Sequence, residues 1–178
     1  MIDFKEDYKS TTILVVDDDP ATLERITALL AGSGIRIEHT TDGEQGLDLA
    51  CRLQPGLLLL GTRISGGEGL EICRRLKISN AGKEIPVILL LDKDAAALSI
   101  KALEAGAADF LFKPLQEQEV FTRIMARLAV YKNRRDAGGM SSQPDSMAKL
   151  RETVNNFEIA LPNVPINIRH PTIVDRSL

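Results

Sequence analysis

The sequence has no tryptophan, only two cysteines and two histidines, and no long apolar run. Its cysteines, Cys51 and Cys73, lie in helix-like patterns without CxxC spacing, which argues against a disulfide framework or a zinc site. No apolar segment approaches the roughly 20 residues that a membrane-spanning helix needs, and the polar N-terminus is unlike a secretory signal. A formal net charge of −3 is too small to attract nucleic acid or an anionic membrane. We therefore expect a cytoplasmic protein that contacts neither.

The sequence does contain a regular alternation of short apolar runs and helical patterns. The apolar runs have strand length, and the segments between them carry apolar residues at helical spacing. The expected strands are residues 12–16, 35–39, 57–60, 86–91 and 108–112. The expected helices begin near Pro20 and Asp42 and cover residues 69–78, 95–105 and 117–132.

This alternation predicts the fold class. Strands that are apolar throughout and alternate with helices indicate a parallel sheet covered on both faces. Right-handed crossovers favour an α/β fold, a doubly wound three-layer sandwich whose five parallel strands have the order 2-1-3-4-5. In such a sheet the site lies where the carboxyl ends of the strands meet. The residues that this rule gathers around one cleft are Asp17, Asp18, Gly61, Leu91, Asp92 and Lys113.

The alternation stops near Arg135, so we expect one domain over residues 11–135. Residues 136–145 (DAGGMSSQPD) have the composition of a linker. Residues 146–178 are expected to form one helix and an extended arm, which is too little for a core of its own. The pattern leaves open whether this tail packs on the domain, reaches a second subunit or begins an output region.

Three consecutive aspartates, Asp17, Asp18 and Asp19, follow the first expected strand. Clustered carboxylates repel one another unless a cation compensates them. Lys113, at the end of the fifth strand, is the internal candidate, and a hard cation such as Mg²⁺ is the external one. We expect at least one of the three aspartates to cap the following helix instead.

Three segments in this frame resemble the receiver domain of bacterial two-component response regulators. They are ILVVDDDP at the first strand, PVILLL at the fourth and GADFLFKPL at the fifth. The resemblance covers about residues 11–135 and implies a flavodoxin-like receiver fold and a signalling role rather than an enzyme. It also implies that Asp17 and Asp18 bind Mg²⁺, that Lys113 is the lysine that contacts the phosphate, and that Phe110 is the aromatic switch residue.

The sequence departs from the family at two central positions. Gly61 stands where the phosphate-accepting aspartate is expected, and Leu91 stands where the family usually has threonine or serine. We interpret the chain as a degenerate receiver, or pseudo-receiver, with weak Mg²⁺ binding at best. We also hypothesise that Arg63 turns into the vacated acidic pocket, and we do not expect Asp92 or Glu68 to replace the missing acceptor.

A receiver without this chemistry is expected to act through protein partners, such as a sensor kinase or an output protein. Asp109 and Arg123 match a charge pair through which DNA-binding relatives dimerise, whereas Glu119 faces Ser99 instead of a basic residue. A homodimer through this face is therefore a further expectation.

Two other functions stay open at this point. One is a response regulator that is phosphorylated at a non-standard acidic residue. The other, more remote, is a phosphohydrolase of the haloacid-dehalogenase kind, because Asp17 and Asp19 have its DxD spacing. Against it, Ala21 stands where that family has threonine or valine.

Overall fold

The computed structural model describes residues 8–137 of the chain. The expected tail and nearly all of the expected linker lie outside these residues. Asp136 and Ala137, which we assigned to the linker, continue the last helix. No helix in this described part is long and apolar enough to cross a membrane.

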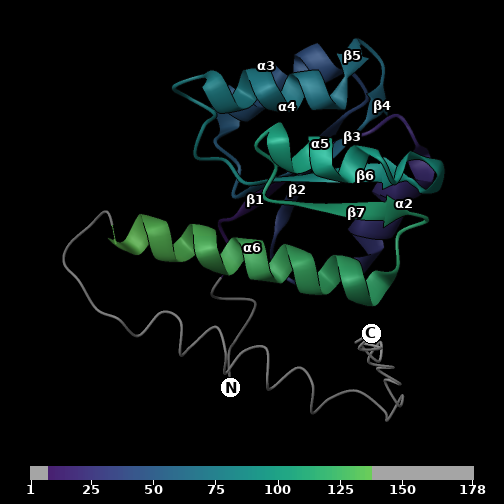
Figure 1. Cartoon of the computed structure of the whole chain (residues 1–178). Coiled ribbons are helices and arrows are strands. Elements are labelled where there is room, and N and C mark those ends of the chain that lie inside the picture. Colours follow the sequence, from purple (N-terminus) through teal and green to yellow (C-terminus); the bar gives the residue numbers. More distant parts are fainter. Residues whose placement is uncertain (1–7, 138–178) are drawn as a thin grey trace, which may run out of the picture. The chain divides into compact units, whose positions relative to one another are not determined.

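The centre of the domain is a five-stranded parallel sheet with the order β2-β1-β3-β6-β7, seen edge-on in Figure 1. In chain order, its strands are β1 (Thr12–Val16), β2 (Arg36–Thr40), β3 (Leu57–Gly61), β6 (Val87–Asp92) and β7 (Asp109–Lys113). Because β3, β6 and β7 are the third, fourth and fifth strands of this sheet, the order equals the predicted 2-1-3-4-5. The predicted fold class is confirmed.

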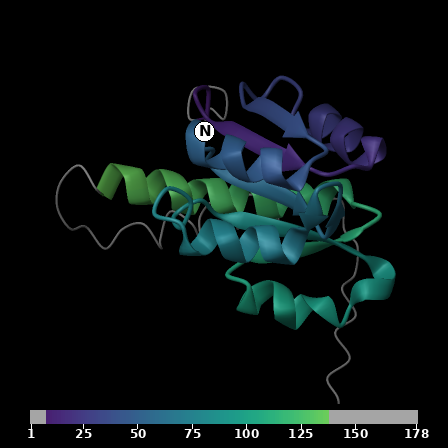
Figure 2. The same ribbon diagram turned by 90° about the horizontal axis from the view of Figure 1, so that it is seen from above.

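Helices cover both faces of the sheet. In chain order they are α2 (Pro20–Leu29), α3 (Gly43–Leu53), α4 (Gly69–Ile78), α5 (Leu98–Glu104) and α6 (Glu117–Ala137). One face carries α3, α4 and α5, which lie in front of the sheet in Figure 2, and the opposite face carries α2 and α6.

Alternate residues along a strand point to opposite faces of the sheet and contribute to two separate hydrophobic cores. In β3, Leu58 and Leu60 pack with α3, α4 and α5, whereas Leu57 and Leu59 pack with α2 and α6. All four leucines are fully buried. Truncating one buried leucine to alanine typically costs about 2–5 kcal/mol, so this strand makes a large contribution to the packing of both layers.

Two aspartates begin helices, as the sequence predicts. The Asp19 side chain accepts a hydrogen bond from the Ala21 backbone N–H at 3.0 Å, and Asp42 accepts one from the Gln45 N–H at 2.8 Å. Such caps typically contribute about 1 kcal/mol each. They fix where the chain turns away from the carboxyl edge of the sheet.

Two segments differ from the prediction. Residues 95–105 were expected to form one helix, but a 3-10 turn, η1 (Lys93–Ala95), precedes a shorter α5. The residue before α5 is Ala97, whose side chain cannot cap the helix. The second difference is a small antiparallel hairpin after β3, made of β4 (Arg63–Ile64) and β5 (Gly67–Glu68).

Candidate functional site

The candidate site lies at the carboxyl edge of the sheet, where Asp17 follows β1 and Lys113 ends β7. The Asp17 side chain is fully buried and that of Lys113 is 18 % exposed. Lys113 Nζ donates a hydrogen bond to Asp17 Oδ1 at 2.9 Å. The other carboxylate oxygen, Oδ2, lies 2.7 Å from the same nitrogen but receives no well-directed hydrogen bond. The backbone N–H of Asp19 also donates to Oδ1, at 2.8 Å.

Opposing effects act on the ionisation of Asp17. Burial raises the pKa of its carboxyl group, while the hydrogen bonds from Lys113 and from the Asp19 N–H lower it, and the neighbouring charge of Asp18 raises it. Burial prevails, so the pKa of Asp17 is raised above its ordinary value. The lysine ammonium is therefore the charge that keeps a buried carboxylate tolerable at neutral pH.

Gly61 ends β3 directly beside this ion pair. A Cβ atom at position 61 would lie 2.7 Å from Asp17 Oδ2 and 3.1 Å from Asp17 Cγ. Real Cβ atoms do not approach other atoms so closely, so the Asp17 carboxylate occupies space that a side chain at position 61 would need. The observed position of the Asp17 carboxylate therefore requires that residue 61 has no side chain.

The start of α4 closes the site from another side. A Cβ on Gly69 would collide with the carbonyl oxygen of Gly61, and the Gly69 N–H donates to the Thr62 carbonyl at 2.9 Å. Only a glycine allows this approach of helix to strand. The backbone around Gly61 is therefore tightly held.

Arg63 does not enter the acidic pocket, and our hypothesis that it does is wrong. Its guanidinium pairs with Asp92 at the end of β6, where Nη2 lies 2.6 Å and Nε 2.9 Å from Oδ2. The antiparallel pairing of Arg63 with Glu68 in the hairpin carries the backbone past the pocket, and Lys113 already supplies a positive charge there. The Arg63 side chain is 76 % exposed.

The residues at this edge do not fit the Mg²⁺ site that the resemblance implies. Mg²⁺ favours carboxylates that are free to coordinate it together with water. Here Asp17 is engaged by Lys113 and Gly61 offers no carboxylate, which leaves the exposed Asp18 as the carboxylate of this set that a hydrated cation can reach. Among residues 8–137 no group of three or more acidic, histidine or cysteine side chains is placed to hold a metal ion.

The two predicted switch positions lie on the neighbouring strands. Leu91 is fully buried in β6 and carries no hydroxyl group with which to follow a phosphate. Phe110 in β7 is half-buried, and its ring meets that of Phe112 edge to face, with centroids 5.6 Å apart.

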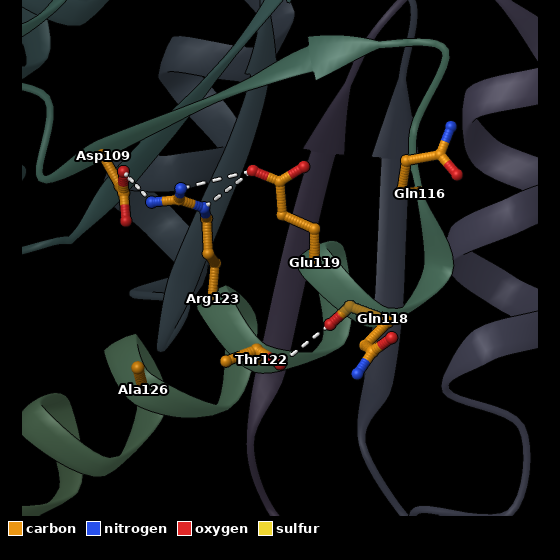
Figure 3. A pocket seen from close by; sticks show the side chains of 7 residues that line it. All are labelled: Asp109, Gln116, Gln118, Glu119, Thr122, Arg123 and Ala126. Atoms are coloured by element: carbon orange, nitrogen blue, oxygen red, sulfur yellow. Dashed lines mark hydrogen bonds and ion pairs between the residues drawn. The ribbon is translucent and has the colours of Figure 1, made fainter. Parts of the chain in front are cut away.

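The predicted interaction face lies on β7 and α6. Arg123 donates to Asp109 at 2.8 Å and to Glu119 at 3.2 Å, so the three predicted residues are joined within one chain. Figure 3 shows this arrangement and the shallow hollow beside it. The hollow is lined by Asp109, Gln116, Gln118, Glu119, Thr122, Arg123 and Ala126.

Arg127 is a member of this network that the sequence reasoning missed. Its Nη2 lies 3.1 Å from Asp109 Oδ2, and its position four residues after Arg123 was the available signal. Burial raises the pKa of Asp109, but hydrogen bonds from Arg123, the Phe110 N–H and Arg127 outweigh it, and the pKa is lowered. Asp109 is therefore a firmly ionised anchor.

Comparison with known proteins shows the family to which the fold belongs. The family model for the response regulator receiver domain matches residues 13–125. The DNA-binding response regulator MtrA of Mycolicibacterium smegmatis is 37 % identical over 116 residues, which are 65 % of this chain and 50 % of that protein. The response regulator MprA of Mycobacterium leprae is 35 % identical over the same shares. The chain thus spans about half the length of the curated relatives it matches.

Solved structures show the same likeness. A response regulator from Chloroflexus aurantiacus is 30 % identical with a TM-score of 0.63, and the match covers 67 % of this chain and 98 % of that one. The receiver domain of a sensor histidine kinase from Pseudomonas aeruginosa, which has a magnesium ion coordinated in its active site cleft, is 28 % identical with a TM-score of 0.59. That match covers 69 % of this chain and 98 % of the other. The chain belongs to the response regulator receiver domain family.

Proposed function

We propose that this domain is a receiver-like module of a two-component pathway that acts by binding protein partners, without phosphorylation at the usual position. The observation that carries the proposal is Gly61 at the carboxyl end of β3, with the Asp17 carboxylate in the space beside it. Glycine has no nucleophile. The usual acceptor is therefore missing, and the pocket in which it would act is filled.

The charges at the site support the same proposal. Lys113 neutralises Asp17 inside the pocket, which leaves Asp18, an exposed residue, as the other acid of the predicted metal pair. We propose that Mg²⁺ binds here weakly or not at all. Receiver chemistry needs a nucleophile about 3–3.5 Å from the phosphorus in the correct line of attack, and Gly61 cannot meet this requirement.

Two other acids lie near the edge of the site, and neither is well placed to replace the acceptor. Asp92 is held by the Arg63 guanidinium, and Glu68 is exposed in the hairpin. Phosphorylation at Asp92 or Glu68 therefore has no structural observation in its favour. The two acids of the alternative phosphohydrolase are also engaged, because Asp17 pairs with Lys113 and Asp19 caps α2.

The face formed by β7 and α6 is the proposed partner surface, with Asp109, Glu119 and Arg123 on it. Neighbouring α5 adds two exposed apolar side chains, Ile100 at 68 % and Leu103 at 52 % exposure. Charges at the rim and apolar side chains beside them are typical of a protein interface. A sensor kinase, an output protein or a second copy of the chain fits this description. The relative MtrA is named a DNA-binding response regulator. We propose no DNA contact for this domain.

The test is an amide NMR titration with Mg²⁺ and then beryllofluoride, which mimics an aspartyl phosphate. We expect no saturable shifts at Asp17, Gly61 or Lys113. The receiver domain of Klebsiella pneumoniae RstA, whose structure was solved in a BeF3-activated form, is the positive control under the same conditions. Saturable shifts on α5, β7 and α6 of this chain would overturn the proposal, and mass spectrometry would then locate the acid that accepts the phosphoryl group.

A further inference from the structure

A second concave site lies at the opposite edge of the sheet, near the amino ends of β6 and β7. It is a hollow of about 230 Å³ between the end of α4, the segment before β6 and the carboxyl-terminal half of α6. Asp109 at the start of β7 and Lys113 at its end are about 13 Å apart along the strand. The hollow is therefore separate from the Asp17 pocket.

The lining of this hollow is strongly basic. Four of its residues are cations and one is an acid: Lys77, Lys83, Arg127, Arg134 and Glu84. The whole chain, in contrast, has a net charge of −3. Gathering cations from three segments of the chain in one concave place produces a local positive potential that attracts anions.

Several hydrogen-bond donors of the residues that line the hollow are not fully used. Arg127 Nε is buried and has no hydrogen-bond partner. Lys77 Nζ donates to the Ile85 carbonyl and, at 3.3 Å, to the Lys83 carbonyl, and an ammonium group has three donors. Arg134 reaches Glu84 only at 3.8 Å, with both side chains largely exposed, so this pair holds its guanidinium weakly.

Lys77 is the half-buried cation of this cluster. Burial lowers the pKa of Lys77, and the charge of Arg134 lowers it further, against the opposing effects of Cys73 and Glu84. An anion placed between these cations would offset their mutual repulsion and favour the charged form of the Lys77 amine. The site is thus built from charges that a ligand of opposite sign would stabilise.

We propose that this hollow binds a small anion bearing a phosphate group, through Lys77, Lys83, Arg127 and Arg134. A phosphate group carries a charge of about −1.5 to −2 at neutral pH, which suits several cations better than a single carboxylate does. The arginine guanidinium matches phosphate oxygens in a planar fork. The volume, about 230 Å³, is below the roughly 300–1,000 Å³ of sites for drug-sized ligands, so it suits a group of phosphate or pyrophosphate size.

Binding at this hollow reaches the partner face through one side chain. Arg127 lines the hollow and also holds Asp109 through Nη2, and Asp109 in turn binds Arg123. An anion that draws the Arg127 guanidinium toward itself weakens the Arg127–Asp109 contact. The amide signals of Asp109 and Phe110 should therefore shift together with those that line the hollow.

The test is a titration of the full chain with pyrophosphate at constant ionic strength, followed by amide NMR and calorimetry, with chloride as the reference anion. We compare Lys83→Ala/Arg134→Ala with the matched control Lys93→Ala/Arg52→Ala. Both double variants remove one lysine and one arginine charge at exposed positions, and thermal unfolding by circular dichroism checks that both fold. We expect saturable binding to the unchanged chain, weakened about tenfold in the first variant and less than about twofold in the control.

Two results would overturn the proposal: shifts that do not saturate, or an equal loss of affinity in both double variants, which would indicate general electrostatic attraction. A second titration with ADP identifies the source of the phosphate. Tighter binding of ADP than of pyrophosphate supports the site as one for the phosphate end of a larger molecule. The reverse order supports it as a site for the free inorganic anion.

Discussion

Replacing Gly61 by alanine is the most direct test of how the acidic pocket is filled. The new Cβ would lie 2.7 Å from Asp17 Oδ2 and 3.1 Å from Ile64 Cγ2, so the Asp17 carboxylate must move away from position 61 to make room. Overpacking of this kind costs about 1–3 kcal/mol. Alanine also restricts the unfolded chain relative to glycine, which returns about 0.4–1 kcal/mol. We therefore expect Gly61→Ala to lower the free energy of unfolding by about 1–2 kcal/mol.

Urea unfolding followed by circular dichroism measures this loss. With a slope of about 2 kcal/mol per molar urea, the middle of the typical range, the midpoint should fall by roughly 0.5–1 M. The same substitution in an Asp17→Ala background isolates the cause, because the colliding carboxylate is then absent. Its cost should fall to within about 0.5 kcal/mol of zero. An equal loss in both backgrounds would refute the reasoning and point to Ile64 as the obstructing side chain.

Three further predictions concern the surrounding surface. The pKa of Asp109 is lowered in the folded state, so its ionised form contributes stability that is present above the ordinary pKa of 3.8. This stability is lost as the pH falls through the folded-state pKa. Urea midpoints at a series of pH values should show the loss in the unchanged chain and not in Asp109→Asn. Arg63→Ala breaks an exposed ion pair with Asp92 and should change the free energy of unfolding by less than about 1 kcal/mol, so a larger loss would show that the pair supports the hairpin. Gly66 has a φ of +80°, and a Cβ added there would collide with the Asp42 carboxylate. Gly66→Ala should therefore cost at least about 1–2 kcal/mol in thermal unfolding, whereas a neutral result would mean that the turn adapts freely.

The sequence predicts the architecture well because its alternation of apolar runs and helical spacing matches the alternation of strands and helices in the fold. The helix expected over residues 69–78 has those bounds in the structure, and β7 is displaced by a single residue from its expected range. The hairpin of β4 and β5 was missed because strands of two residues contain no alternation of apolar and polar side chains. Its one local signal was Ser65–Gly66, where Gly66 at φ +80° suits the third position of a type II turn.

The site was predictable in its location and not in its side-chain contacts. Strand order alone brings Asp17 and Lys113 to one edge, and the structure places their charged groups in contact. Which partner a long side chain selects depends on rotamers and backbone direction, which residue spacing does not encode. For this reason Arg63 was assigned to the wrong carboxylate. Arg127 was overlooked although its spacing from Arg123 placed it on the same face of the helix.

The Lys113–Asp17 ion pair also connects two strands that are not neighbours. β1 and β7 are not neighbours in the sheet, because β3 and β6 lie between them, and strands in a sheet are about 4.8 Å apart. The ion pair therefore acts as a lateral cross-link over the open ends of two intervening strands, a distance of about 14 Å from strand to strand. Local opening of this edge of the sheet requires the ion pair to break. Amide hydrogen exchange at the ends of β3 and β6 should therefore be slowed by this contact, although neither strand contributes an atom to it.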